Sequence, residues 1–185
     1  TLEDHIMPVR SVLQMLHQQE LKVNRKKCHF GQRSLEYLGH IISGRGVEAD
    51  PSKLEAMSKW PTPKDVKGLR GFLGLTGYYR RFVRGYEKLA QPLNALLKKD
   101  AFQWNKETAA AFEQLKEAMQ KLPTLIVPNF SKVFTLETDA LGTGLGAVLL
   151  RENKLLAFWS KALSERNQQK SVYERELMAV VMTVK

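Results

Sequence analysis

The sequence has little of several features that define particular classes of protein. Its 185 residues contain one cysteine, Cys28, which excludes a disulfide framework and a zinc site of several cysteines. No apolar run approaches 18 residues, so no membrane-spanning helix is expected. The first residues lack an initiator methionine and lack the basic head and apolar stretch of a signal peptide. These absences favour a soluble, intracellular piece of a longer protein.

Acidic residues are scarce relative to basic ones. The chain has 29 Lys and Arg against 19 Asp and Glu, a net charge of +10. Residues 1–100 hold 18 basic and 10 acidic side chains, whereas residues 101–185 hold 11 and 9. The basic clusters at 25–27 and 80–84 have aromatic neighbours, as a surface that grips phosphates and stacks on bases would. Charge alone leaves a merely solvated basic surface as the alternative.

Hydrophobic spacing predicts a mixed α and β chain with a domain boundary near residues 122–130. Asp50 before Pro51 is a typical helix start, and a hairpin is expected within residues 34–42. The predicted helices cover residues 3–20, 50–60, 63–83, 86–98, 106–121 and 171 onward, and the predicted strands cover 21–24, 134–138, 146–150 and 155–159. The last helix has an apolar stripe of Tyr173, Leu177, Val180, Val181 and Val184.

Four glycines interrupt the helix predicted over residues 63–83, namely Gly68, Gly71, Gly74 and Gly77. Each interior glycine costs about 0.5–1 kcal/mol relative to alanine. Either the helix breaks near residues 74–77, or the glycines form a strip that a large partner approaches closely. We favour the strip, with Val66, Leu69 and Leu73 on the core face.

One carboxylate stands at the end of a predicted strand. Asp139 is followed by a glycine-containing turn, and exposed carboxylates are the ligands that Mg²⁺ prefers. A second carboxylate would come from the last helix, where Glu174 and Glu176 flank the apolar stripe on opposite sides. Helical geometry does not choose between them. Turn chemistry for the aspartate and solvation for the glutamates remain the simpler alternative.

Several stretches of the chain together resemble the Pol polyprotein of gypsy-type LTR retrotransposons. They are collinear with that family over nearly the whole chain: Leu21–Phe30 with Tyr37–Ser43, Trp60–Phe82, Phe102–Lys116, and Leu136–Leu149 with Tyr173–Leu177. The resemblance implies the end of a reverse transcriptase palm (1–48), the thumb (49–98), the connection (99–130) and the start of a ribonuclease H-like domain (131–185). The implied fold class is α+β: a short palm hairpin, a helical thumb, then an incomplete ribonuclease H-like three-stranded antiparallel sheet with one helix.

The resemblance also implies roles for individual residues. A primer grip would hold the primer terminus, the thumb helix would follow the duplex minor groove, and a basic residue would lie near the incoming nucleotide. The primer grip would consist of Tyr37, Leu38, Gly39 and His40. The residues of the thumb that contact the duplex would be Lys67, Gly71 and Leu75, with Arg80 and Arg81 beyond them. The residue near the incoming nucleotide would be Lys27, with Lys26 as its alternative. Asp139 and Glu176 would be the first two carboxylates of the ribonuclease H metal site, a choice over Glu174 that rests on the family pattern alone.

The parent enzyme implied by this family is an RNA-directed DNA polymerase and ribonuclease H that uses Mg²⁺ or Mn²⁺. Its partners would be an RNA–DNA hybrid, a DNA duplex, a primer terminus and the rest of the polyprotein, in the cytoplasm within a virus-like particle or in the nucleus, with no membrane. In this family the polymerase carboxylates lie before Thr1 and the remaining ribonuclease H carboxylates after Lys185, and Leu141 replaces the usual serine. We therefore expect this chain alone to be inactive. The alternative is a non-catalytic, degenerate or co-opted remnant that binds nucleic acid.

Overall fold

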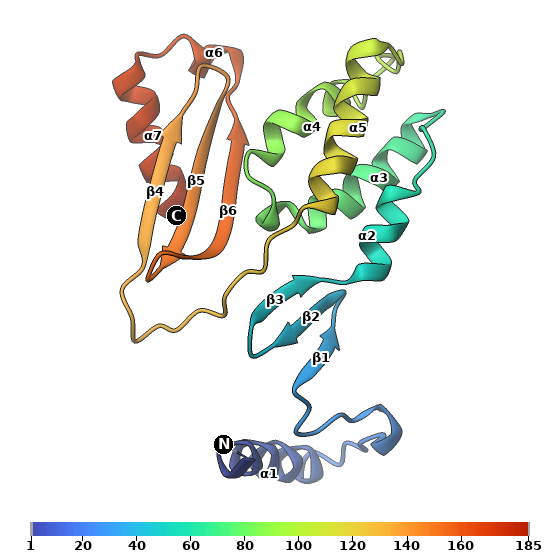
Figure 1. The fold of residues 1–185 in the computed structure, drawn as a ribbon, viewed down its shortest axis with the longest axis vertical. Helices are drawn as coiled ribbons and strands as arrows, with labels where there is room; N and C mark the ends of the chain where they lie inside the picture. Colours follow the sequence, from blue (N-terminus) through green and yellow to red (C-terminus); the bar gives the residue numbers. More distant parts are fainter. Residues whose placement is uncertain (1, 185) are drawn as a thin grey trace.

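A computed structural model describes residues 2–184, in which a helix, a small sheet, a helical centre and a second sheet follow one another (Figure 1). The helices are α1 (Leu2–Gln18), α2 (Pro51–Ser58), α3 (Val66–Tyr78), α4 (Tyr86–Ala95), α5 (Lys106–Gln120), α6 (Glu165–Gln168) and α7 (Val172–Val184), with 3-10 turns η1 (Arg25–Lys27) and η2 (Arg80–Phe82). The strands are β1 (Ser34–Tyr37), β2 (His40–Ser43), β3 (Gly46–Ala49), β4 (Thr135–Ala140), β5 (Gly144–Arg151) and β6 (Lys154–Ala162). The predicted α+β class is confirmed. No helix within residues 2–184 is both long and apolar enough to cross a bilayer.

The small sheet extends the predicted hairpin by one strand. β1 and β2 pair antiparallel around a turn at Leu38–Gly39, and β3 pairs with β2. The strand predicted over residues 21–24 is wrong. The Asn24 side chain accepts a hydrogen bond of 3.1 Å from the Lys26 N–H and begins η1, a local bond that competes with strand pairing.

The helical centre contains the main core. The Asp50 carboxylate accepts from the Ser52 N–H at 2.8 Å, so α2 begins where the sequence predicts. α3 runs unbroken through all four glycines but ends at Tyr78, so a break near 74–77 does not occur. Its buried face is Leu69, Phe72, Leu73 and Thr76, whereas Val66 is only half-buried. The Phe72 and Phe112 rings lie 4.5 Å apart, and this packing of α3 on α5 offsets the cost of the glycines.

The second sheet has a helix on each face (Figure 1). Its order is β4-β5-β6, all antiparallel, as predicted. α7 packs on one face through the fully buried Ala179, which contacts Leu145 in a small second core. On the other face the Glu87 N–H of α4 donates to Ser160 Oγ at 3.1 Å. α4 approaches the sheet at β6, so the face opposite α7 is only partly covered.

The apolar stripe predicted on the last helix faces solvent. Tyr173 is 88% exposed and Leu177 is 64% exposed, and the other members of the stripe are also exposed. Ala179, with Met178 and Met182 beside it, makes the contact with the sheet instead. A small residue at the centre lets the helix approach the strands closely, which the bulky stripe would prevent.

Candidate nucleic-acid interface and carboxylate site

The hairpin turn presents two apolar side chains to solvent. Tyr37 is 56% exposed and Leu38 is 69% exposed. Both turn residues have left-handed backbone angles, φ 49° at Leu38 and φ 73° at Gly39, as a tight two-residue hairpin requires. The turn thus points Tyr37 and Leu38 away from the core, whereas the half-buried His40 ring faces it.

Two tyrosines from the end of α3 hold this turn. Tyr78 Oη donates to the Leu38 carbonyl at 2.5 Å, and Tyr79 Oη donates to the Gly39 carbonyl at 2.6 Å. The His40 ring lies 5.2 and 5.4 Å from the Tyr78 and Tyr79 rings, centre to centre. Sequence reasoning missed these contacts because they join residues 40 positions apart, and the only signal was an aromatic pair beside an arginine pair.

The predicted minor-groove residues of α3 differ in exposure. Lys67 and Gly71 are exposed, whereas Leu75 is half-buried and packs against the core. A Cβ at Gly71 would lie 3.2 Å from Trp60 Cζ2, so an indole edge lies beside this glycine. At Gly74 a Cβ would meet no atom within 4 Å. The open part of the glycine strip is therefore centred on Gly74, beside Gly71.

Basic side chains continue this surface along η2 and into α4. Arg80, Arg81, Arg84 and Lys88 are all exposed, and none of them forms a salt bridge within the part of the chain that the structure describes. Uncompensated arginines and lysines of this kind attract phosphates. Lys26 and Lys27 are exposed too, but they lie in η1, toward the α1 end of the molecule.

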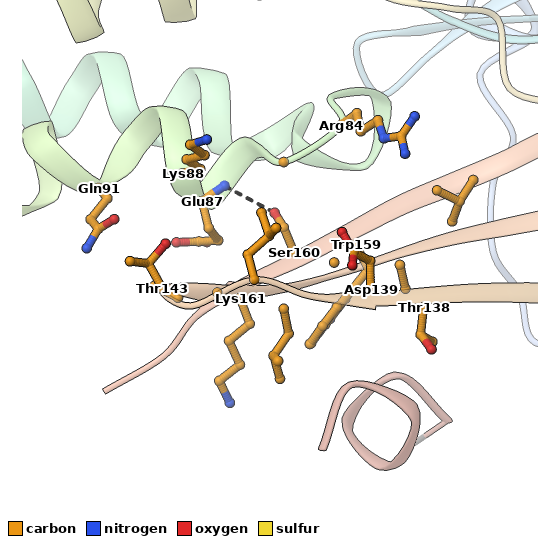
Figure 2. Close-up of a pocket in the computed structure, with 18 of the residues that line it drawn as sticks. Arg84, Glu87, Lys88, Gln91, Thr138, Asp139, Thr143, Trp159, Ser160 and Lys161 are labelled. Atoms are coloured by element: carbon orange, nitrogen blue, oxygen red, sulfur yellow. Dashed lines mark hydrogen bonds between the residues drawn. The ribbon is translucent and has the colours of Figure 1, made fainter. Parts of the chain in front are cut away.

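Asp139 lies in a cleft of about 450 Å³ between α4 and the second sheet (Figure 2). Its strand partner is Gly146, and Ser160 on β6 pairs with the same glycine, so Asp139 and Ser160 lie on the α4 face. Figure 2 shows Asp139 and its neighbour Thr138 pointing to opposite sides of the sheet. Arg84 and Lys88 line the cleft from the α4 side.

The two glutamates of α7 have different environments. Glu174 accepts hydrogen bonds of 2.9 Å from both the N–H and the hydroxyl of Ser171, which closes the first turn of the helix. The backbone hydrogen bond from Ser171 is the main cause that lowers the pKa of Glu174. Glu176 is half-buried, in a helix that packs on the face opposite the cleft. Glu174 is thus already used as a capping residue, and Glu176 is not.

These carboxylates do not form a metal cage by themselves. Mg²⁺ takes six oxygen ligands, and residues 2–184 contain no group of three or more His, Cys, Asp or Glu side chains placed to hold a metal ion. Asp139 faces the cleft while α7 packs on the other side of the sheet. The described residues therefore do not fit a bound Mg²⁺, and no metal-dependent step is assigned to this chain alone.

Comparisons of the sequence and of the fold relate this chain to the same group of known proteins. A family model described as an RNase H-like domain found in reverse transcriptase matches residues 104–185. The fold is similar to that of a foamy viral protease-reverse transcriptase in complex with an RNA/DNA hybrid, with a TM-score of 0.87 and 18% identity over 100% of this chain and 26% of the other. The family model places residues 104–185 in the class of ribonuclease H-like domains found in reverse transcriptase, and the structural neighbour shares the fold of the whole chain.

The sequence relatives narrow this class. The chain is 37% identical over its whole length to the Pol polyprotein of transposon 297, and 34% identical over 96% of its length to that of transposon gypsy, both from Drosophila melanogaster. It is also 55% identical over 125 residues to an uncharacterized mitochondrial protein of Arabidopsis thaliana. The aligned region covers 66% of this chain and 79% of that protein. The chain belongs to the Pol polyprotein family of gypsy-type LTR retrotransposons. It spans 18% of the length of each of the two Drosophila polyproteins.

Proposed function

We propose that this chain is the segment of a retrotransposon reverse transcriptase that grips the primer–template duplex. The observation that carries the proposal is the contact between the hairpin turn and the end of α3. It brings the exposed Tyr37 and Leu38 next to the residues that directly precede Arg80 and Arg81. Apolar tips beside unpaired arginines suit sugars and bases next to phosphates.

The segment boundaries follow the same assignment. Residues 1–48 are the end of the palm with Tyr37–His40 as primer grip, 49–98 the thumb, 99–130 the connection and 131–185 the start of the ribonuclease H-like domain. Lys67, Gly71 and Leu75 contact the minor groove, and Lys27 or Lys26 lies toward the incoming nucleotide. The parent protein copies RNA into DNA and cleaves the RNA of hybrids.

In this proposal the family pattern assigns Asp139 and Glu176 to the parent's ribonuclease H metal site, although in this chain the cleft that holds Asp139 and the helix that carries Glu176 lie on opposite faces of the sheet. Two-metal hydrolysis needs a cage that holds two cations about 3.5–4 Å apart, and two carboxylates do not make one. The chain alone is therefore inactive, and the Mg²⁺ or Mn²⁺ chemistry belongs to the longer protein. Robust cleavage of a hybrid by the purified chain, abolished by Asp139→Asn, would contradict this.

Photocrosslinking tests the grip. A photoreactive nucleotide at the recessed 3′ end of a primer should crosslink to residues 37–40. The same nucleotide placed within the duplex, one turn away from the end, should crosslink to residues 67–81 instead. Crosslinks from the primer end that map mainly to residues 98–121, or that do not change with the position of the nucleotide, would refute the assignment.

A second candidate is a non-catalytic remnant that keeps only nucleic-acid binding. The Arabidopsis relative favours this candidate because the region aligned with this chain makes up 79% of that protein. A protein with little beyond this segment therefore exists. The flanking reading frame separates the two candidates. Intact downstream and upstream carboxylates support the enzyme, and early stop codons support the remnant.

A further inference from the structure

The hairpin turn is in a conformation that needs support. Leu38 has φ 49°, and a left-handed backbone at a residue with a side chain costs about 1–2 kcal/mol. Its side chain is 69% exposed and contributes little packing. What holds the turn must therefore come from its backbone groups.

Both carbonyls of the turn are bonded to residues outside the hairpin. Leu38 O accepts from Tyr78 Oη at 2.5 Å. Gly39 O accepts from Tyr79 Oη at 2.6 Å and from the Asp50 N–H at 3.1 Å. The turn is thus attached to the end of α3 and to the start of α2.

The tyrosine rings are also packed in place. Tyr79 is 1% exposed, and the His40 ring lies 5.4 Å from it and 5.7 Å from the Phe82 ring, centre to centre. Burial is the main cause that raises the pKa of Tyr79 to about 12, so its hydroxyl stays a donor at neutral pH. Tyr78 is half exposed and lies edge-on to Tyr79. The pair forms a two-bond connection between a palm hairpin and a thumb helix.

We infer that Tyr78 and Tyr79 are positioning residues that fix the hairpin tip relative to Arg80 and Arg81, so that the contact with the primer end and the contacts with phosphates form one rigid unit. This rests on the proposed function. The arginines follow the tyrosines directly along the chain, so a shift of the tyrosine hydroxyls away from the turn would change the spacing between the two contacts. The hydroxyls of the pair are bonded to the turn, and the positioning role is therefore exerted through Tyr37 and Leu38.

The test combines a structural and a binding measurement on the whole chain. The double variant Tyr78→Phe/Tyr79→Phe keeps both rings and removes only the two hydroxyls. Tyr173→Phe, at an 88% exposed tyrosine on α7, is the matched control. Amide hydrogen exchange is measured at residues 38–41 and Asp50, and affinity is measured for a duplex with a recessed 3′ end and for a blunt duplex of equal length.

In the double variant we expect exchange of the turn amides to become about 30-fold faster, as the loss of two ordinary neutral hydrogen bonds predicts. Exchange within α3 and affinity for the blunt duplex should stay unchanged, and the preference for the recessed end should fall. A merely structural role would weaken both duplexes equally. Unchanged exchange at the turn, or an unchanged preference for the recessed end, would overturn the positioning role. A wild-type chain that binds neither duplex would refute the proposed function itself, whatever the exchange data show.

Discussion

Substitution of Gly74 by alanine tests whether α3 is a continuous helix with an open glycine strip. Gly74 is exposed, and an added Cβ meets no atom within 4 Å. Alanine in place of an interior helical glycine stabilises by about 0.5–1 kcal/mol. In a domain of this size, a gain of about 1 kcal/mol raises Tm by about 2–4 °C. Gly74→Ala should therefore raise both Tm and the urea midpoint of unfolding.

Gly71→Ala is the matched control for this experiment. It brings the same gain in helix propensity, but its Cβ would lie 3.2 Å from Trp60 Cζ2, so the indole has to move. We expect a smaller gain than for Gly74→Ala, or a loss. If Gly74→Ala destabilised the chain while Gly71→Ala did not, the helix would not run through residue 74 as described, and the reasoning would be refuted.

Three further changes have definite expected outcomes. Thr76→Val removes the buried hydroxyl that lies 2.9 Å from Tyr86 Oη, and chemical denaturation should show a loss of about 1–3 kcal/mol. Hydrogen bonds from Ser52 lower the pKa of Asp50. The ionised Asp50 therefore contributes stability at pH values above its ordinary pKa of 3.8, and this stability is lost as the pH falls through the lowered pKa. Asp50→Asn should flatten the acid limb of a stability–pH profile. The exposed apolar stripe of α7 predicts that the chain self-associates in sedimentation velocity. Leu177→Gln, at a 64% exposed site in this stripe, should reduce that self-association and change stability by less than about 0.5 kcal/mol.

Local chemistry explains what could be predicted from the sequence. The Asp50–Pro51 start of α2 depends on a capping bond between neighbours, and it lies where the sequence predicts. The three strands of the second sheet were also found, because alternation and turn residues are local signals. The turn between β5 and β6 has left-handed angles at Glu152 and Asn153, as a two-residue hairpin needs.

What could not be predicted depends on contacts between distant residues. The helical wheel of α7 shows a bulky apolar stripe, but amphipathicity alone does not say which side of the helix packs on the sheet. In the structure the side with the small Ala179 packs on the sheet. The pattern at 21–24 alternates like a strand, yet no strand within residues 2–184 pairs with it, and Asn24 makes a local bond instead. Likewise nothing near Tyr78 and Tyr79 indicates a turn 40 residues earlier.

The candidate carboxylate site likewise combines features that could be predicted from the sequence with features that could not. Asp139 at a strand end is a local pattern, and the structure places it exposed in a cleft. The Ser171 bonds show that Glu174 caps the first turn of α7, whereas the choice of Glu176 as the site carboxylate still rests on the family pattern. Arg84, just before α4, and Lys88 on α4 also line the cleft, and the sequence gives no signal of this because the contact joins residues far apart in the chain.

The salt dependence of binding to an RNA–DNA hybrid tests the central claim most directly. Each arginine that contacts a phosphate contributes about 0.9 to the slope of log affinity against log salt concentration, so Arg80→Gln/Arg81→Gln should lower that slope by about 1.8. Lys98→Gln/Lys99→Gln removes the same charge from an exposed pair beyond the far end of α4 and should leave the slope unchanged. Equal slopes for the two variants, or wild-type binding that does not depend on salt, would contradict the account of this surface as a duplex grip.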